Sequence, residues 1–393
     1  MRRTRTSIGL AAAASLALVL SACGGDDDGG SGSAAPAGPS GDVGETDLAA
    51  AGCPDTVVIQ TDWNPEAEHG GIYQLVGDDS AIDAGAKSVT GTLVDSEGAS
   101  TGVLVEVRAG GPAIGFQAVS AQMYSDDAIT LGYVDTDEAI QLSGSQPTVG
   151  VLAQLEKSPQ MIMWDPETYP DVDEIADLAG TDATVRYFEG SAYMDYLVGA
   201  GILREDQLDG SYDGTPAAFV ASDGADAQQG YASAEPYIYE NEVDAWGRPV
   251  EYQLVHDAGF QVYASSLSVR ADQLEALSGC LTELVPLMQQ ADLDYIDDPA
   301  GANELILELV EQYDTGWQYS EGVAEYSVAT MDELGISGNG EDDTHGNFDE
   351  ARLQTLIEQT TPIFTEQGTP PAEGLTPQDI ATNEFIDMSI GAV

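Results

Sequence analysis

The sequence predicts an α/β protein made of two lobes with a ligand cleft between them. Short apolar runs alternate with helix-like segments from residue 56 to residue 269, and this alternation predicts parallel β-sheets covered by helices. About 370 residues follow the N-terminal leader, more than one typical hydrophobic core holds. Two α/β blocks followed by a long helical part imply that the chain crosses between the lobes twice, and clefts between lobes bind small ligands.

The N-terminal segment has the features of an export signal. Three arginines lie within the first five residues, and an apolar run follows at 8–20, too short to span a bilayer. The run ends in Leu20-Ser21-Ala22-Cys23, which resembles the bacterial lipobox. The resemblance implies that residues 1–22 are a lipoprotein signal peptide, that Cys23 is lipidated, and that the chain is anchored on the extracytoplasmic face of the cell membrane. The alternative is an ordinary secretory signal with a chance cysteine.

The segment after the signal is expected to be a tether. Residues 24–45 are almost entirely Gly, Asp, Ser, Ala and Pro, a composition that cannot bury a core. We therefore expect an acidic, flexible tether over residues 23–52, as a membrane-anchored protein requires.

Regular elements are expected from the apolar spacing and the turn residues. Compact apolar runs predict buried strands at 57–59, 102–107, 129–134, 148–152, 160–164, 184–188, 217–221, 252–255 and 259–269. Helix-like spacing, with a capping-box pattern at residues 135–138, predicts helices at 72–76, 113–124, 135–142, 173–178, 192–199, 271–290, 301–317, 324–334, 349–366 and 376–388.

The net charge limits the possible partners. After the leader, eight Lys and Arg stand against 69 Asp and Glu, a net charge of −61. Nucleic acid and anionic membrane surfaces are unlikely partners for such a chain, because both need clustered cations. The acids are scattered over every segment, as in proteins that meet high salt, where screening weakens self-repulsion. Adaptation to salt is a hypothesis that rests on this composition.

The cysteines suit an exported protein. With Cys23 assigned to the lipid, Cys53 and Cys280 remain, and an even pair outside the cytoplasm predicts a disulfide. Two free buried thiols are the alternative. A disulfide would tie the entry of the first strand to a late helix, with an entropic stabilisation of about 5 kcal/mol.

The loop after the first strand carries the first candidate binding residues. In TDWNPEAEHGG, Trp63, Asn64 and His69 follow the apolar run, and ligands of open α/β sheets lie beyond the carboxyl ends of the strands. Trp63 offers a stacking face, Asn64 a donor and an acceptor, and His69 a donor or an acceptor. The alternative is that Trp63 packs locally and the polar side chains are solvated.

Three stretches resemble one known family. They are TDWNPEAEHGGIY (61–73), IADLAGTDATVRYFEGSAYMDYLV (175–198) and ADAQQGYASAEPYIYE (225–240). In this order they are similar to the extracytoplasmic substrate-binding proteins of ABC importers, in the NMT1/THI5-like group related to thiamine-pyrimidine, sulfonate and nitrate binders. Residues 74–92 depart from the family, because they lack its Lys-x-x-Gly segment and Gly-Leu-x-Val strand. This departure suggests a trimmed first lobe.

The resemblance implies a type II periplasmic-binding-protein-like fold whose lobes close on the ligand about a two-stranded hinge. The crossings are then expected near residues 141–149 and 246–251. Lobe 1 would comprise 54–145 plus 251–393, and lobe 2 would comprise 146–250. The implied partners are a small-molecule ligand and an ABC permease in the membrane, with the protein itself a monomer and not an enzyme.

The resemblance also places further ligand-binding candidates on the cleft loops. They are Asp135, Thr136, Glu189, Ser191, Glu235 and Tyr237. Asp135 and Thr136 begin a helix, and simple capping is the alternative. Ser191 lies where free backbone N–H groups could receive an anion or a carbonyl, or where it would only cap a helix. For Glu235 the alternative is solvent exposure.

The expected ligand is a flat nitrogen-bearing molecule. An anion such as nitrate or a sulfonate would require Arg or Lys in the cleft, and only Arg186 lies beside a candidate loop. A pyrimidine-like vitamin precursor is the first expectation. The alternatives are an amine, a sulfonate or nitrate in the same fold, or a secreted enzyme acting on a pyrimidine precursor. No cofactor, metal or catalytic residue is expected, and residues 339–347, although acidic, do not fit the EF-hand pattern.

Overall fold

Two mixed β-sheets form the core of the structure, a computed structural model that describes residues 36–392. The predicted signal peptide and Cys23 lie outside these residues. All described residues belong to one unit of the chain.

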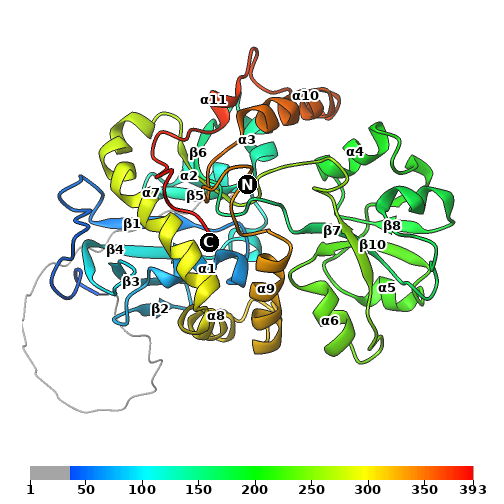
Figure 1. Cartoon of the computed structure of the whole chain (residues 1–393), viewed down its shortest axis with the longest axis horizontal. Coiled ribbons are helices and arrows are strands. Elements are labelled where there is room, and N and C mark those ends of the chain that lie inside the picture. The colour runs from blue at the N-terminus through cyan, green and yellow to red at the C-terminus, as the bar shows by residue number, and fades with distance from the viewer. Residues whose placement is uncertain (1–35, 393) are drawn as a thin grey trace, which may run out of the picture. The chain divides into compact units, whose positions relative to one another are not determined.

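The larger sheet has seven strands in the order β2-β3-β4-β1-β5-β12-β6 (Figure 1). They are β1 (Thr56–Gln60), β2 (Ala81–Asp83), β3 (Ser88–Val94), β4 (Ser100–Arg108), β5 (Leu131–Val134), β6 (Thr148–Leu152) and β12 (Ser266–Arg270). β1 is parallel to both neighbours, β4 and β5. Residues 74–92, which depart from the family pattern, contain strand β2 and the start of β3, and β3 pairs antiparallel with both β2 and β4.

The smaller sheet has five strands in the order β11-β7-β10-β8-β9. They are β7 (Gln160–Trp164), β8 (Thr184–Arg186), β9 (Leu208–Asp209), β10 (Asp226–Tyr231) and β11 (Glu251–Leu254). β8 is parallel to β9 and β10, whereas β7 is antiparallel to β10 and β11. The α/β fold class is confirmed, but both sheets are mixed, because β12 and β7 run against their neighbours.

The chain crosses between the sheets later than the sequence suggested. β6 (148–152) belongs to the larger sheet, although residues 146–250 were expected to form lobe 2. β11 (251–254) belongs to the smaller sheet, although it was expected in lobe 1. The crossings therefore fall at 153–159 and 255–265. The apolar pattern located the strands but carried no information about which sheet each strand joins.

Helices cover both faces of the larger sheet (Figure 1). They are α1 (Gly70–Gln74), α2 (Val119–Ser125), α3 (Thr136–Leu142), α7 (Leu274–Asp297), α8 (Ala300–Tyr313), α9 (Glu321–Glu333), α10 (Glu350–Glu366) and α11 (Pro377–Ile380). Along β1, Val57 and Ile59 pack into the core that contains α7 and α8, whereas Val58 packs into the core that contains α2, α3 and α10. This alternation follows from the two-residue period of a strand.

The smaller sheet carries α4 (Ala192–Gly199), α5 (Ala217–Ala221) and α6 (Glu235–Asn241). The expected strand at 217–221 is wrong, since these residues form α5. Pro216 precedes the helix with φ −71°, a value suited to a helix start. Alanine favours the helix, and Phe219 is its one buried side chain.

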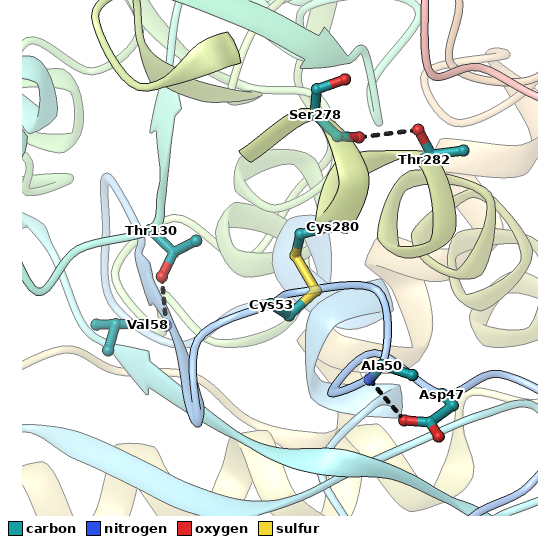
Figure 2. The surroundings of a disulfide bond; sticks show 8 residues. All are labelled: Asp47, Ala50, Cys53, Val58, Thr130, Ser278, Cys280 and Thr282. Atoms are coloured by element: carbon teal, nitrogen blue, oxygen red, sulfur yellow. Dashed lines mark hydrogen bonds between the residues drawn. A yellow bond between two sulfur atoms is a disulfide. The ribbon is translucent and has the colours of Figure 1, made fainter. Parts of the chain in front are cut away.

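A disulfide joins Cys53 to Cys280, which confirms the predicted pair. Figure 2 shows the bond between the segment that enters β1 and helix α7. The turn beside it is held by a hydrogen bond from the Ala50 N–H to an Asp47 oxygen, 2.9 Å long. The bond closes a span of 227 residues around the larger sheet.

The expected tether of residues 23–52 is too long. Val43 bridges to Ser100 on β4, and the Leu48 N–H donates to the Thr101 carbonyl at 2.9 Å. The Leu48 side chain is fully buried in the larger core. Residues 43–52 therefore pack on the larger sheet, with Leu48 as the buried side chain.

Candidate functional site

A cavity of about 300 Å³ is lined by residues from both sheets. The loops after β1, β5 and β10 contribute to it, together with the crossing segments and residues 317–319. Loops at the carboxyl ends of strands are where ligands bind in open α/β sheets. The size suits a small organic molecule, at the lower end of the range for ligand pockets.

The loop after β1 is held in one conformation by its neighbours. The Thr61 hydroxyl donates to the Trp63 carbonyl at 2.8 Å, and the Tyr319 hydroxyl accepts from the Ala67 N–H at 2.9 Å. Gly111 has a positive φ of 53°, and a Cβ there would lie 2.7 Å from the Trp63 ring. The glycine thus lets the chain pass directly against the indole, which fixes Trp63 at the cavity wall.

Asp62 and Asp135 meet at Ser265. The Ser265 hydroxyl donates to Asp62 Oδ2 at 2.6 Å, and the Ser265 N–H donates to Asp135 Oδ1 at 2.7 Å. Burial opposes ionisation of Asp62, but the hydrogen bond and charge of His69, together with the Ser265 hydrogen bond and a backbone hydrogen bond, lower its pKa overall. Burial raises the pKa of Asp135 well above its usual value, and the charges of Asp137 and Asp62 add to the effect.

Three glutamates form a second acidic group in the cavity. The Ser233 hydroxyl donates to Glu68, and the Tyr231 N–H donates to Glu235 Oε2 at 2.6 Å. Burial raises the pKa of Glu235 to about 7. Burial also raises the pKa of Glu68.

Glu66 is the least compensated of the three. Glu66 is only 7% exposed. Within residues 36–392, its carboxylate accepts no hydrogen bond. Burial raises its pKa well above the usual value, and the charges of Glu68, Asp62 and Glu235 raise it further. A buried carboxylate without a partner is costly, and a cation supplied by a ligand would relieve that cost.

No lysine or arginine lines the cavity in the described part of the chain. All six arginines of the described residues form ion pairs with Asp or Glu: Arg108, Arg186, Arg204, Arg248, Arg270 and Arg352. Lys87 and Lys157 donate to backbone carbonyls. Arg186, the cation nearest to a predicted site loop, pairs with Asp209 at 2.8 Å and with Asp226 at 2.7 Å.

Aromatic rings complete the walls. Trp63 meets Trp317 edge-on at a centroid distance of 6.0 Å, and Trp317 stacks on Tyr319 at 6.2 Å. On the side of the smaller sheet, Phe188 packs against Tyr212 at 4.8 Å. Such faces attract organic cations as well as flat rings.

Three of the nine predicted ligand-binding residues line the cavity: Trp63, Asp135 and Glu235. The structure brings these three together from separate loops of both sheets. The other six do not line it.

Asn64, His69 and Thr136 are buried behind the cavity wall. Asn64 Oδ1 accepts from the Thr315 hydroxyl at 2.8 Å. His69 Nε2 contacts Asp62 at 2.8 Å, and its ring stacks on Tyr133. His69 therefore positions a residue that lines the cavity.

Glu189, Ser191 and Tyr237 lie outside the cavity. Glu189 is exposed. The Ser191 hydroxyl donates to the Phe188 carbonyl at 2.7 Å and makes no capping bond to α4. The Tyr237 ring packs on Tyr326, with centroids 5.6 Å apart.

Sequence reasoning missed most of the acidic lining. Asp62, Glu66 and Glu68 lie in the same loop as Trp63, and their spacing was a usable signal. In a chain with 69 acids, however, three more attract no notice. Trp317 and Tyr319 gave no signal, since they follow α8 and reach the cavity only through the tertiary fold.

The described residues contain neither a candidate metal site nor a candidate membrane span. Among residues 36–392, no group of three or more His, Cys, Asp and Glu side chains is arranged to hold a metal ion. Over the same residues, no helix is both long and apolar enough to cross a membrane.

Comparisons with known proteins identify the fold. No family model and no curated protein matches the sequence. The structure resembles the periplasmic aliphatic sulphonate-binding protein SsuA from Escherichia coli, with 15% identity, a TM-score of 0.50, and coverage of 85% of this chain and 92% of that one. It also resembles a ligand-binding component of an ABC-type import system from Staphylococcus aureus with zinc bound, with 12% identity, a TM-score of 0.52, and coverage of 85% and 100%. The chain therefore has the two-lobed type II periplasmic-binding fold.

Proposed function

We propose that this protein is an extracytoplasmic solute-binding protein that captures a small, positively charged, nitrogen-bearing organic molecule and delivers it to an ABC importer. The observation that carries the proposal is the cavity, which five carboxylates line and no lysine or arginine does within the described residues. The fold supports the transport role, since the similar structures include a component of an import system.

Anions are poorly suited to this cavity. A sulfonate or nitrate needs a fixed cation or several free N–H donors to replace its hydration. Here Asp62 and Asp135 occupy the hydrogen bonds of Ser265, and Arg186 is committed to two aspartates. An anion would also enter among five carboxyl groups. We therefore do not propose a sulphonate, the ligand named for the similar Escherichia coli protein, as the ligand of this chain.

A protonated amine or an aminopyrimidine matches the walls. Its N–H groups can donate to the oxygens of Glu66 and Glu235, and its apolar or aromatic part can lie against Trp63 and Trp317. The pyrimidine precursor and the amine expected from the sequence both remain in this class. The NMT1/THI5-like relationship is also part of the proposal and rests on the three stretches that resemble that group.

The proposal includes attachment to the membrane. A lipid on Cys23 would hold the protein at the extracytoplasmic face of the cell membrane, close to a permease. The support is the signal-like segment with its lipobox-like end. Palmitate labelling of the full chain in a bacterial host should mark the protein, and Cys23→Ala should lose the label.

A thermal-shift and calorimetric screen tests the function. The mature chain from residue 24 would be screened with alkylamines, aminopyrimidines, alkanesulfonates and nitrate. A ligand present at 100 times its Kd should stabilise the protein by about 2.7 kcal/mol. Glu66→Gln should weaken binding of the cation, whereas Glu189→Gln, which removes an exposed carboxylate outside the cavity, should not.

The outcomes separate the alternatives. Stabilisation by amines or aminopyrimidines, with the compound recovered unchanged, supports the proposal. Preference for a sulfonate or nitrate would refute the cationic class. Conversion of a pyrimidine would instead indicate the enzyme alternative.

A further inference from the structure

The five carboxylates of the cavity fall into two groups. The Ser265 pole consists of Asp62 and Asp135, which both bond to Ser265. The Glu66 pole consists of Glu66, Glu68 and Glu235, and the last two bond to the segment 231–235. We infer that the ligand is an organic dication, a diamine in the broad sense, with one cationic N–H group at each pole and an apolar linker between them. This inference rests on the proposed function and narrows its ligand class.

The two poles share the loop after β1 but differ in the other elements that build them. The Ser265 pole joins the ends of β1 and β5 to the residue before β12, all in the larger sheet. In the Glu66 pole, Glu235 begins α6 on the smaller sheet, and Glu68 reaches across to Ser233. A ligand that contacts the Ser265 pole and Glu235 therefore bridges the two sheets, which is how a two-lobed fold couples binding to closure.

The hydrogen bonds within each pole leave acceptors for a ligand. Asp135 Oδ2 and Glu235 Oε1 accept no hydrogen bond within residues 36–392, and neither does the Glu66 carboxylate. Glu66 is the strongest sign of a missing partner, because it is 7% exposed and faces only like charges. A single ammonium would contact one of these groups of acceptors, whereas a ligand with an N–H group at each end can contact Asp135 in one pole and Glu66 or Glu235 in the other.

Aromatic side chains line the cavity together with both poles. Trp63 separates Asp62 from Glu66 along the loop and lines the cavity with them. Tyr231 also lines the cavity, and its pKa is raised well above the usual value by burial and by charges from both poles, namely Asp135, Asp62, Glu66 and Glu68. Tyr231 is therefore near both acidic groups. Methylene groups or a ring would pack against these faces, whereas a chain of polar atoms would not.

The experiment compares matched ligands by calorimetry on the mature chain at pH 8. The dications are 1,3-diaminopropane to 1,6-diaminohexane, and each is paired with the monoamine of equal carbon number. One diamine length should bind about 100-fold more tightly than its monoamine, as expected for one additional charge-assisted contact. Asp135→Asn and Glu235→Gln should each reduce that ratio to below about 10 while monoamine binding persists. Glu189→Gln should leave the ratio unchanged.

Each outcome has a defined meaning. Equal affinity for diamines and monoamines overturns the dication but leaves the proposed function standing. Tighter binding of an alkanesulfonate than of any amine overturns both, and so does the absence of binding by every cation. The melting temperature of each variant shows whether it is folded. A smaller ratio of diamine to monoamine affinity in a folded variant can then be assigned to the pole that was changed.

Discussion

Glu235→Gln should change how the stability of the empty protein depends on pH. Burial raises the pKa of Glu235 from 4.5 to about 7, so the folded state holds this proton more tightly than the unfolded state does. For a carboxyl with a raised pKa, the folded protein is favoured at low pH. That advantage is lost as the pH rises through the window between about 4.5 and 7.

The magnitude follows from the size of the shift. A pKa difference of about 2.5 units corresponds to about 3 kcal/mol once the group is ionised in both states. Since glutamine cannot ionise, Glu235→Gln should match the wild type near pH 4 and exceed it by about 3 kcal/mol at pH 8. The Tyr231 N–H can still donate to the glutamine carbonyl oxygen, so the variant should lose little hydrogen bonding.

The assay is urea unfolding at several values of pH and constant salt, followed by far-UV circular dichroism. The free energy of unfolding of the variant minus that of the wild type is plotted against pH. This difference in the free energy of unfolding should grow as the pH rises from about 4.5 to about 7. A saturating cationic ligand should reduce the pH dependence of the wild type, because the ligand stabilises the ionised form. A difference that stays flat from pH 4 to pH 8 would refute the account of Glu235 as an acid whose pKa is raised by its surroundings in the folded state.

Three further predictions concern other features. Trp63→Ala should weaken ligand binding roughly 10-fold by removing a stacking or cation–π face, and calorimetry with an unchanged Kd would remove Trp63 from the site. Replacing both Cys53 and Cys280 by Ser should lower the free energy of unfolding by up to about 5 kcal/mol, because the bond closes a 227-residue span; equal denaturation midpoints would argue against that stabilisation. Molar NaCl should raise the melting temperature by screening the repulsion among 69 acids, and a melting temperature independent of salt would count against salt adaptation.

The sequence predicted the elements better than it predicted their partners. Strands at 148–152 and 160–164 and the helix at 192–199 were placed at their observed limits, because apolar runs and turn residues are local signals. The sheet that receives β6 or β11 depends on hydrogen bonds between distant segments, and the local pattern does not record it. The strand expected at 217–221 failed for a local reason, since a short apolar run without a clear period fits either element.

The candidate site was also predicted only in part, because local sequence patterns do not record tertiary contacts. Trp63 and Asp135 follow strand ends directly, and Glu235 begins the helix after β10, so their positions in the chain predict that they lie near the cleft. His69 and Asn64 lie on the same loop as Trp63 but point to interior partners, Asp62 and Thr315. Whether a side chain on this loop faces the cavity or the interior of the protein depends on tertiary packing. Residue type alone therefore could not distinguish the residues that line the cavity from those that hold the lining residues in place.

The acidity of the cavity is not a by-product of the acidic composition. An exposed carboxylate costs little, because water and salt solvate it, and most of the 69 acids can be carried in that way. A carboxylate at the position of Glu66 is different, since burial penalises its charge and neighbouring acids add to the penalty. Eight Lys and Arg follow the leader, and the six arginines among them form ion pairs with Asp or Glu outside the cavity. A structural role for Glu66 would be better served by pairing it with one of them or by replacing it with an apolar residue. A group that destabilises the empty protein is explained if its partner arrives from outside, so the cost of Glu66 is an argument for a cationic ligand.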